Sequence, residues 1–328
     1  VELAEALRDG GDGTRVRGVC YTAKQAPDDA LVLPSYGDAA GEKRQFLEMF
    51  RGFYANNDPV TARRLAQQQD TRYLVQNPPA EYLSGDELDA VSAIEYEREA
   101  HPSHAAAGPV RALETIRFAI ATHRGCYGEC NFCSIAMHQG RRVRWRSRAS
   151  IVAEAKRIAA HPAFKGTITD VGGPTANMYG CECARKAVEG CCEDKRCLFP
   201  EVCSALEVDH GAQIELLRAL RAVPGVKRVV VASGVRHDMV MADRRHGPKY
   251  LRELVRHHVS GQLKVAPEHS ELRVLELMGK PDTASLLAFR KAFQRLTGEE
   301  GKRQFLTYYL IAAHPGCEEK DMHAAKQF

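Results

Sequence analysis

The chain has 328 residues, enough for one large domain and a smaller one with a substantial core. Its 46 basic and 42 acidic residues leave a net charge of +4, which is too even to indicate a polyanionic partner. No apolar run approaches the roughly 18 residues of a membrane span, and no secretory signal is visible. The eleven cysteines are therefore expected to be reduced thiols or metal ligands in a cytoplasmic protein.

Residues 1–100 are predicted to be the tail of an N-terminal α/β domain followed by a linker. The chain begins at Val1 with a pattern that is already helical, so it is expected to be a piece of a longer protein. Strands are predicted at 16–23, 30–36 and 72–80, and helices at 42–53 and 61–69. A polar, acidic stretch at 85–104 is predicted to be the linker.

Residues 101–328 show a regular alternation of strands and helices. Apolar strands are predicted at 115–122, 167–173, 226–233, 261–267 and 305–313. Amphipathic helices are predicted at 150–160, 212–223, 249–259 and 284–296. Strands that alternate with helices of this length imply parallel pairing through right-handed crossovers. The pattern indicates either most of a parallel (β/α) barrel or an open, doubly wound sheet.

Three cysteines follow the first of these strands, in the stretch HRGCYGECNFCS. Cys126, Cys130 and Cys133 have C-x3-C-x2-C spacing, at the strand end where β/α barrels carry their chemistry. Three thiolates can hold three irons of a [4Fe–4S] cluster and leave the fourth iron open. The amine and carboxylate of S-adenosylmethionine suit that open iron. A zinc site fits less well, because closed tetrahedral zinc needs a fourth nearby ligand.

Five motifs in order carry a resemblance to a known family. They are the stretches 123–141, 170–180, 197–203, 232–239 and 264–270, and Phe132 supplies an aromatic residue before the last cysteine. Together they resemble the radical S-adenosylmethionine (SAM) enzymes, and within them the YgiQ-like family. The resemblance implies a partial barrel of six strands, of which five are visible here. It also implies an enzyme that cleaves SAM to a 5′-deoxyadenosyl radical, which abstracts hydrogen from an unidentified substrate.

The resemblance also implies cofactor contacts at the strand ends. The residues are Phe132, Gly172, Gly173, Thr175, Ser233, Arg236, Glu268 and His314. Arg236 is expected to hold the SAM carboxylate in a fork of hydrogen bonds, Glu268 to lie near the ribose, and His314 near the adenine. Relatives often carry Gly-Gly-Glu after the second strand; here Pro-Thr replaces the glutamate. Residues 1–100 resemble a flavodoxin-like tail without the D-x-H-x-x-G motif, so cobalamin is not predicted.

A second group of cysteines lies in an insertion at about 178–205. It holds six cysteines, at 181, 183, 191, 192, 197 and 203, with little apolar material to pack. A metal would stabilise such a segment, either as structural zinc or as a second [4Fe–4S] cluster. The YgiQ-like pattern favours Cys183, Cys192, Cys197 and Cys203, with Cys191 competing for the second place. The alternative is free thiols in a flexible insertion.

Two other functions remain as alternatives. An iron–sulfur electron-transfer protein would use its cysteines for redox relay alone. An RNA-modifying enzyme of the same superfamily would use the five arginines between 141 and 148 as an electrostatic contact, although such a run is more often a solvated loop. The expected partners are a small reductant protein of the flavodoxin or ferredoxin type and a substrate that the sequence does not identify.

Overall fold

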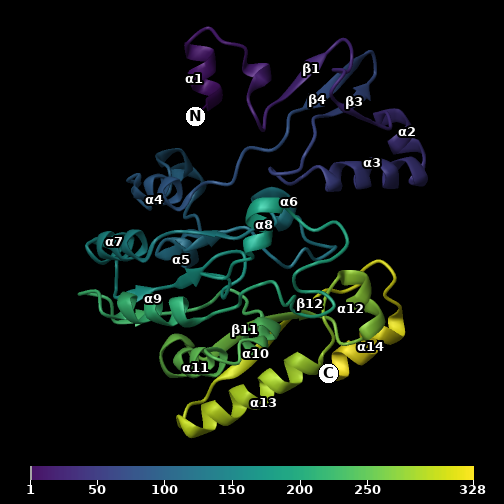
Figure 1. Ribbon diagram of the computed structural model, residues 1–328. Helices are drawn as coiled ribbons and strands as arrows, with labels where there is room; N and C mark the ends of the chain where they lie inside the picture. Colours follow the sequence, from purple (N-terminus) through teal and green to yellow (C-terminus); the bar gives the residue numbers. More distant parts are fainter. Residues whose placement is uncertain (1) are drawn as a thin grey trace. The chain divides into compact units, whose positions relative to one another are not determined.

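The protein is described by a computed structural model that covers residues 2–328 (Figure 1). The chain forms two compact units. The smaller contains the residues through Tyr82 together with Ala184–Asp194, and the larger contains Leu83–Cys183 and Lys195–Phe328. The predicted domain division at residue 100 stays a prediction. Across residues 2–328, no helix is both long enough and apolar enough to cross a membrane.

The smaller unit is built on a mixed sheet of four strands in the order β1-β4-β3-β2. The strands are β1 (Cys20–Ala23), β2 (Leu31–Leu33), β3 (Leu65–Gln69) and β4 (Arg72–Gln76). The β1–β4 and β3–β4 pairs are antiparallel, and the β2–β3 pair is parallel. The other elements of this unit are α1 (Glu2–Arg8), a 3₁₀ turn (Gly13–Arg15), α2 (Tyr36–Gly41), α3 (Lys43–Ala55) and α8 (Ala184–Glu189).

One secondary-structure prediction in the first hundred residues was wrong. The helix predicted at 61–69 is strand β3, in which Ala66 lies opposite Val75 and both side chains are fully buried. Pairing with β4 outweighed the local helical pattern, because cross-strand packing depends on residues outside the segment. The predicted linker contains helix α4 (Gly85–Ala93), which starts at a capping box. In that box Glu87 accepts from the Ser84 amide, and the Ser84 hydroxyl accepts from the Glu87 amide.

The larger unit contains the predicted parallel strands. They are β5 (Ala119–Ala121), β8 (Thr167–Ile168), β9 (Asp170–Gly172), β10 (Arg228–Val229), β11 (Gln262–Glu268) and β12 (Phe305–Leu310). The pairs β5–β9, β8–β10 and β11–β12 are parallel, and a parallel bridge joins Val235 to Val265. β8 and β9 are two parts of the strand predicted at 167–173, so the five predicted strands neighbour one another in chain order. A doubly wound sheet would instead require a reversal of that order. The observed order confirms the α/β fold of partial-barrel type; no pairing closes the barrel within residues 2–328.

Helices alternate with these strands (Figure 1). They are α5 (Leu113–Ile116), α6 (Ile135–Gln139), α7 (Arg148–Ala159), α9 (Gly211–Arg221), α10 (His237–Ala242), α11 (Gly247–Glu253), a π-helical turn (Leu254–His258), α12 (Leu272–Met278), α13 (Ala284–Glu299) and α14 (Glu319–Gln327). A 3₁₀ segment (Pro102–Ala107) precedes α5, and β6 (His123–Arg124) pairs antiparallel with β7 (Arg144–Trp145). Helix α7 packs on α9, α9 on α11, and α10 on both α11 and α13.

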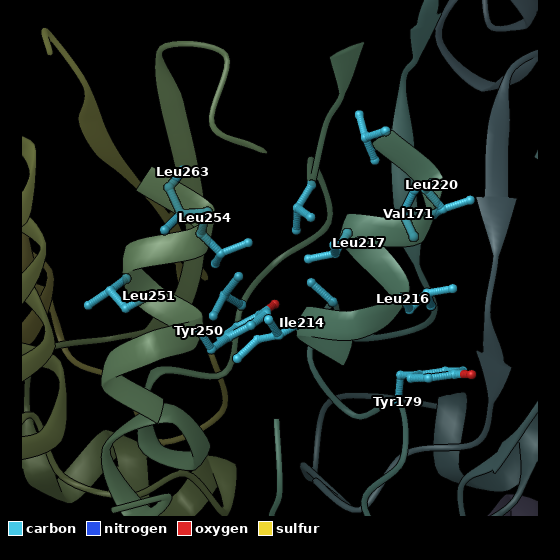
Figure 2. Close-up of a cluster of buried hydrophobic side chains, with 14 of the residues drawn as sticks. Val171, Tyr179, Ile214, Leu216, Leu217, Leu220, Tyr250, Leu251, Leu254 and Leu263 are labelled. Carbon is cyan, nitrogen blue, oxygen red and sulfur yellow. The ribbon is translucent and has the colours of Figure 1, made fainter. Parts of the chain in front are cut away.

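The main core lies between these helices and the strands. Figure 2 shows Val171 of β9, Leu217 of α9 and Leu263 of β11 in this cluster, together with Tyr250 and Leu254. All five side chains are fully buried. Burial of each side chain of this size stabilises the fold by about 1.5–3 kcal/mol relative to exposure. This core holds the strand ends in fixed positions and so sets the geometry of the loops that follow them.

Candidate metal centre

The three cysteines of the C-x3-C-x2-C motif lie on the loop between β6 and α6, which we call the cysteine loop (residues 125–134). The loop follows β5 and β6, at the carboxyl end of the first parallel strand. The Cys126 amide donates to the Gly140 carbonyl at 3.2 Å, and the Cys133 amide donates to the Cys130 carbonyl at 3.0 Å. The cysteines thus sit on backbone that is tied at both ends of the motif.

Two glycines allow this backbone path. Gly125 has φ +83°, and a Cβ at this position would lie 2.1 Å from the Arg142 carbonyl oxygen, so no side chain fits there. A Cβ on Gly128 would lie 3.3 Å from the Cys126 Sγ and 3.5 Å from the Cys130 Sγ. The Gly128 amide also donates to the Cys126 sulfur at 3.3 Å. Gly128 therefore leaves room for two of the three sulfurs on one side of the loop.

Asn131 anchors the middle of the cysteine loop to helix α12. Its amide N donates to the Met278 carbonyl at 2.9 Å, and its Nδ2 donates to the Leu277 carbonyl at 2.7 Å. These two carbonyls belong to the last turn of α12, where the helix leaves its carbonyls without internal partners. Arg196 Nη2 donates to Asn131 Oδ1 at 2.7 Å and completes the side-chain amide's partners.

The strand-end motifs predicted to contact a cofactor do meet the cysteine loop. Thr175 Oγ1 lies 3.8 Å from the Cys126 Sγ. A Cβ on Gly172 would lie 3.6 Å from the Ser233 side chain, so the loops after the second and third strands are adjacent. Ser233 donates its hydroxyl and its amide to Asp170. A Cβ on Gly173 would lie 2.6 Å from the His123 ring, which leaves no space for a larger residue.

Arg236 places its guanidinium beside a sulfur of the cysteine loop. Its Nη1 lies 3.9 Å from the Cys130 Sγ, and its Nε donates to Asp238 Oδ1 at 2.8 Å while its Nη2 donates to Oδ2. The paired edge of the guanidinium, predicted to receive a cofactor carboxylate, is thus occupied by Asp238. Burial alone would raise the pKa of Asp238, but the Arg236 charge and its hydrogen bonds outweigh burial and hold that pKa below its usual range.

The Cys126 thiol experiences opposing influences. Desolvation raises its pKa, while the Gly128 amide and the Arg236 charge lower it. Because desolvation is the largest of these influences, the net shift is upward. A metal ion that binds the sulfur would stabilise the thiolate directly. Three cysteines supply the soft donors that an iron–sulfur cluster takes, and the sulfurs of Cys126 and Cys130 lie beside Gly128 near the Arg236 cation.

The fourth and fifth strands contribute Glu268 and His314. Glu268 ends β11 with φ +71°, and burial raises its pKa, although the charges of Lys280 and Arg236 oppose this. Lys280 Nζ lies 4.0 Å from the Glu268 carboxylate. The rings of His314 and Phe132 meet edge to face with centroids 6.4 Å apart. The roles predicted for Glu268 near a ribose and for His314 near an adenine stay predictions.

Three residues of this region were not identified from the sequence. Asp238 and Asn177 hold Arg236, and Lys280 is a buried cation that donates to the Ala266 carbonyl at 2.6 Å. Asp238 stands two residues after Arg236 in the motif at 232–239, so the sequence carried a signal for this opposite charge. Lys280 gives no such signal, because it follows α12 and reaches the strand ends only through the fold.

The second group of cysteines shows two kinds of environment. Within the larger unit, Cys183 and Cys197 are buried in an apolar cluster that Cys203 packs against, and the Cys203 amide donates to the Cys197 carbonyl at 2.8 Å. Within the smaller unit, the Cys191 thiol donates to Asp58 Oδ2 at 2.9 Å. Cys191, the competing ligand in the prediction, is therefore already engaged as a thiol.

A different set of metal-type side chains has its ligand atoms close together. Among residues 2–328, Asp209, Asp243 and His246 have such atoms within 4.8 Å of one another. The Asp209 Oδ1 is 2.6 Å from His246 Nδ1, and Asp243 accepts from the His246 amide at 2.8 Å and from His210 Nδ1 at 2.8 Å. These hydrogen bonds account for the cluster as a cap between α10 and α11.

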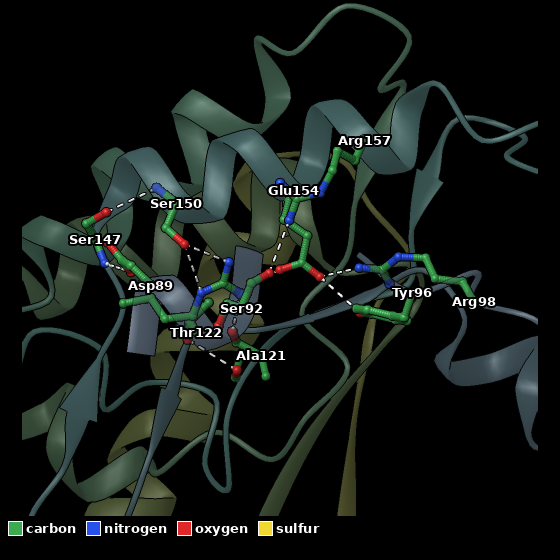
Figure 3. Close-up of polar contacts among 12 residues, drawn as sticks. Asp89, Ser92, Tyr96, Arg98, Ala121, Thr122, Ser147, Ser150, Glu154 and Arg157 are labelled. Carbon is green, nitrogen blue, oxygen red and sulfur yellow. Dashed lines mark hydrogen bonds and ion pairs between the residues drawn. The ribbon is translucent and has the colours of Figure 1, made fainter. Parts of the chain in front are cut away.

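The arginine run at 141–148 is part of the architecture. Arg146 binds Glu154 at 2.5 Å, and Arg98 binds the other oxygen of the same carboxylate (Figure 3). The remaining four arginines also have partners: Arg141 pairs with Glu129, Arg142 with Glu182, Arg148 with Glu215, and Arg144 donates to the Leu83 carbonyl. Arg141 and Arg146 are buried. The run is thus neither the solvated loop that was expected nor a continuous exposed basic surface.

Comparison with solved structures finds a distant likeness. A cobalamin-dependent S-adenosylmethionine radical enzyme, OxsB, covers 85% of this chain and 36% of its own, with a TM-score of 0.45 and 12% sequence identity.

Sequence comparison finds much closer relatives. The family described as Radical SAM N-terminal matches residues 1–119. A UPF0313 protein of Fusobacterium nucleatum is 50% identical over 100% of this chain and 58% of its own length. UPF0313 proteins of Thermotoga neapolitana and Methanocella arvoryzae are 43% and 42% identical over 96% and 98% of this chain. The chain spans 56% and 53% of those two relatives. It belongs to the radical S-adenosylmethionine superfamily, and its UPF0313 relatives agree with the YgiQ-like motifs.

Proposed function

We propose that this chain is the core of an enzyme that binds a [4Fe–4S] cluster through Cys126, Cys130 and Cys133 and cleaves S-adenosylmethionine reductively. The 5′-deoxyadenosyl group released would then abstract hydrogen from a substrate that is not yet identified. The observation that supports the proposal is the cysteine loop itself, which carries three free cysteines after the carboxyl end of the first barrel strand. When bound, the cluster supplies the electron that breaks the sulfonium C–S bond.

The chain's own residues would hold the methionine end of the cofactor beside the cysteine loop. The glycines at 172 and 173 end the second strand, where the resemblance places backbone carbonyls near the methionine ammonium. The Gly172 carbonyl itself accepts from the Thr122 amide at 2.7 Å and from the Thr122 hydroxyl at 3.2 Å, so the ammonium would need the carbonyls that follow it. Two buried ion pairs, Arg236–Asp238 and Lys280–Glu268, border the same region. A zwitterionic amino acid group is the kind of ligand that such fixed charges of both signs orient.

The test is anaerobic reconstitution followed by iron analysis and product detection. We expect dithionite-reduced protein to release 5′-deoxyadenosine from S-adenosylmethionine. Cys130→Ala should lose that product and the iron of this site, because each thiolate holds one iron. Cys20→Ala, at an exposed cysteine of the smaller unit, is the matched control and should keep both. An electron-transfer protein would hold iron but release no 5′-deoxyadenosine, which is the outcome that would remove the proposal.

We also propose that the segment at 180–203 binds a second metal through its cysteines, either as [4Fe–4S] or as zinc. The engagement of the Cys191 thiol by Asp58 supports Cys192 as the ligand from this adjacent pair. Metal analysis separates the versions: about eight irons per chain supports two clusters, and about four irons with one zinc supports structural zinc. Four irons without zinc would contradict a second site. Cys191→Ala should leave the metal content unchanged.

A reductant protein of the flavodoxin or ferredoxin type is the partner that this chemistry requires. The alternative of an RNA-modifying enzyme rested on the arginine run, in which each arginine binds a carboxylate or a carbonyl of this chain and two of the five are buried. This arrangement favours the substrate-unknown enzyme over the RNA-modifying alternative, because the run offers no continuous basic surface.

A further inference from the structure

The position of Arg236 is fixed by a buried asparagine. The Arg236 amide donates to Asn177 Oδ1 at 2.8 Å, and Asn177 Nδ2 donates back to the Arg236 carbonyl at 3.0 Å. Asn177 is fully buried, and its Nδ2 also lies 3.1 Å from His210 Nε2. The His210 Nδ1 lies 2.8 Å from Asp243, so the ring nitrogen that faces Asn177 is the acceptor. The loop after the third strand is thereby clamped to the loop after the second.

The side chain of Arg236 is fixed as firmly as its backbone. Asp238 binds Nε and Nη2, and both side chains of this pair are at least nine-tenths buried. The remaining nitrogen, Nη1, faces the cysteine loop at 3.9 Å from the Cys130 Sγ. A Cβ on Gly128 would lie 3.3 Å from Nη1, so the glycine also leaves space for the guanidinium.

We propose that Arg236 tunes the reduction potential of the cluster by holding one N–H of its guanidinium against the Cys130 sulfur. The inference rests on the proposed role of Cys130 as an iron ligand. Reduction adds one negative charge to the cluster, and a hydrogen bond or a positive charge beside a ligand sulfur stabilises the reduced form. Asp238 fixes the direction of the N–H and offsets part of its charge. In this assignment Arg236 acts through a cluster ligand rather than on the carboxylate of the cofactor.

The proposal predicts shifts of opposite sign for the two members of the ion pair. Arg236→Gln removes the cation and leaves Asp238 charged, so the potential should become more negative. Asp238→Asn removes the anion and leaves the cation, so the potential should become more positive. Arg236→Lys keeps the charge without the fork geometry and should restore part of the wild-type value. A packing defect alone would not shift the potential in opposite directions in Arg236→Gln and Asp238→Asn.

The experiment is a redox titration of the anaerobically reconstituted full chain, with dithionite as reductant and the electron paramagnetic resonance signal of the reduced cluster as readout. At the wild-type midpoint potential, Arg236→Gln should lower the ratio of reduced to oxidised cluster by roughly tenfold or more, the scale of a lost hydrogen bond to a charged group. Arg148→Gln, which removes an exposed arginine paired with Glu215, is the control and should leave the ratio unchanged.

The result that would overturn the inference is an Arg236→Gln protein with full iron content and the wild-type potential. Shifts of the same sign in Arg236→Gln and Asp238→Asn would overturn it as well. If the potential of Arg236→Gln is unchanged and its binding of S-adenosylmethionine is at least tenfold weaker, Arg236 binds the cofactor carboxylate instead of tuning the cluster. If Arg236→Gln does not load iron, Asp238→Asn and Arg236→Lys still decide the sign. Failure of the wild-type chain to hold any cluster would instead count against the proposed function.

Discussion

The cysteine loop and the arginine run lie within 25 residues of each other, and both attract attention in the sequence because one residue type is concentrated there. In the structure, side chains of the first come together and those of the second do not. Two sulfurs of the cysteine loop border the same glycine, and residues from the second and third strand ends reach them. Each arginine of the run binds a different partner, and two of the five are buried. A concentration of one residue type indicates a site only where the side chains converge.

Backbone conformation explains why one stretch converges and the other does not. The cysteine loop turns through residues with positive φ at Gly125 and Glu129, so side chains several positions apart share one side. The arginine run includes strand β7, Arg144–Trp145, and successive side chains of extended backbone point to opposite sides. Its arginines are therefore distributed among several neighbouring elements.

The strongest test of this contrast is the buried carboxylate that receives the arginine run. Glu154→Gln leaves Arg98 and Arg146 buried without a negative partner, and we expect a loss of about 3–5 kcal/mol in the free energy of unfolding. Glu215→Gln removes the exposed partner of Arg148 and should cost about 0–1 kcal/mol. Urea unfolding followed by the fluorescence of the single tryptophan, Trp145, measures both. Equal losses would mean that the run is a surface feature after all.

Replacing Gly125, at the start of the cysteine loop, tests whether the loop needs its tight backbone path. Gly125 and Gly108 have φ +83° and +86°, but a Cβ would meet the Arg142 carbonyl at 2.1 Å in the first and nothing within 4 Å in the second. Gly108→Ala should therefore cost only the strain of positive φ, about 1–2 kcal/mol. Gly125→Ala should cost about 1–3 kcal/mol more and lower the iron content of the reconstituted protein. Equal effects would contradict the close contact between the loop and the arginine run.

His258, outside both segments, is a buried histidine whose charged form is disfavoured by burial. His258 Nδ1 donates to the Val229 carbonyl at 2.9 Å. Burial lowers the pKa of His258 to about 4, while Glu253 opposes this shift and Arg221 adds to it. Between pH 6.5 and 4 the unfolded chain binds a proton that the folded chain does not. Stability should therefore fall as the pH falls through this window, by about 1.4 kcal/mol per pH unit for this residue.

His258→Asn removes the titration while keeping a donor for the Val229 carbonyl, so its unfolding free energy should depend less steeply on pH. His123 and His237 have pKa values lowered to about 4 by burial and should maintain the rest of the slope. His323→Asn, at an exposed histidine of α14, is the control. Urea unfolding at several pH values between 4 and 7 measures the slopes, and an unchanged slope in His258→Asn would contradict the shifted pKa.

Much of the larger unit could be predicted because its signals are local. Apolar residues at helical spacing predicted α7, α9 and α13 within a few residues of their observed ends. The strand at 261–267 was predicted almost to its bounds as β11, and the cysteine spacing indicated the superfamily. The segment at 115–116 was predicted as strand but belongs to α5, because element ends carry the weakest pattern.

What the sequence by itself determined was the alternation of strands and helices and the spacing of the three cysteines, since both depend on neighbouring residues. The tertiary structure alone decided that the five predicted strands neighbour one another in chain order, which separates a partial barrel from a doubly wound sheet. It also decided that Arg236 faces Cys130, 106 positions away, and that two arginines of the run, Arg141 and Arg146, are buried. Such contacts depend on how packed elements bring distant segments together, and no spacing along the chain encodes that distance.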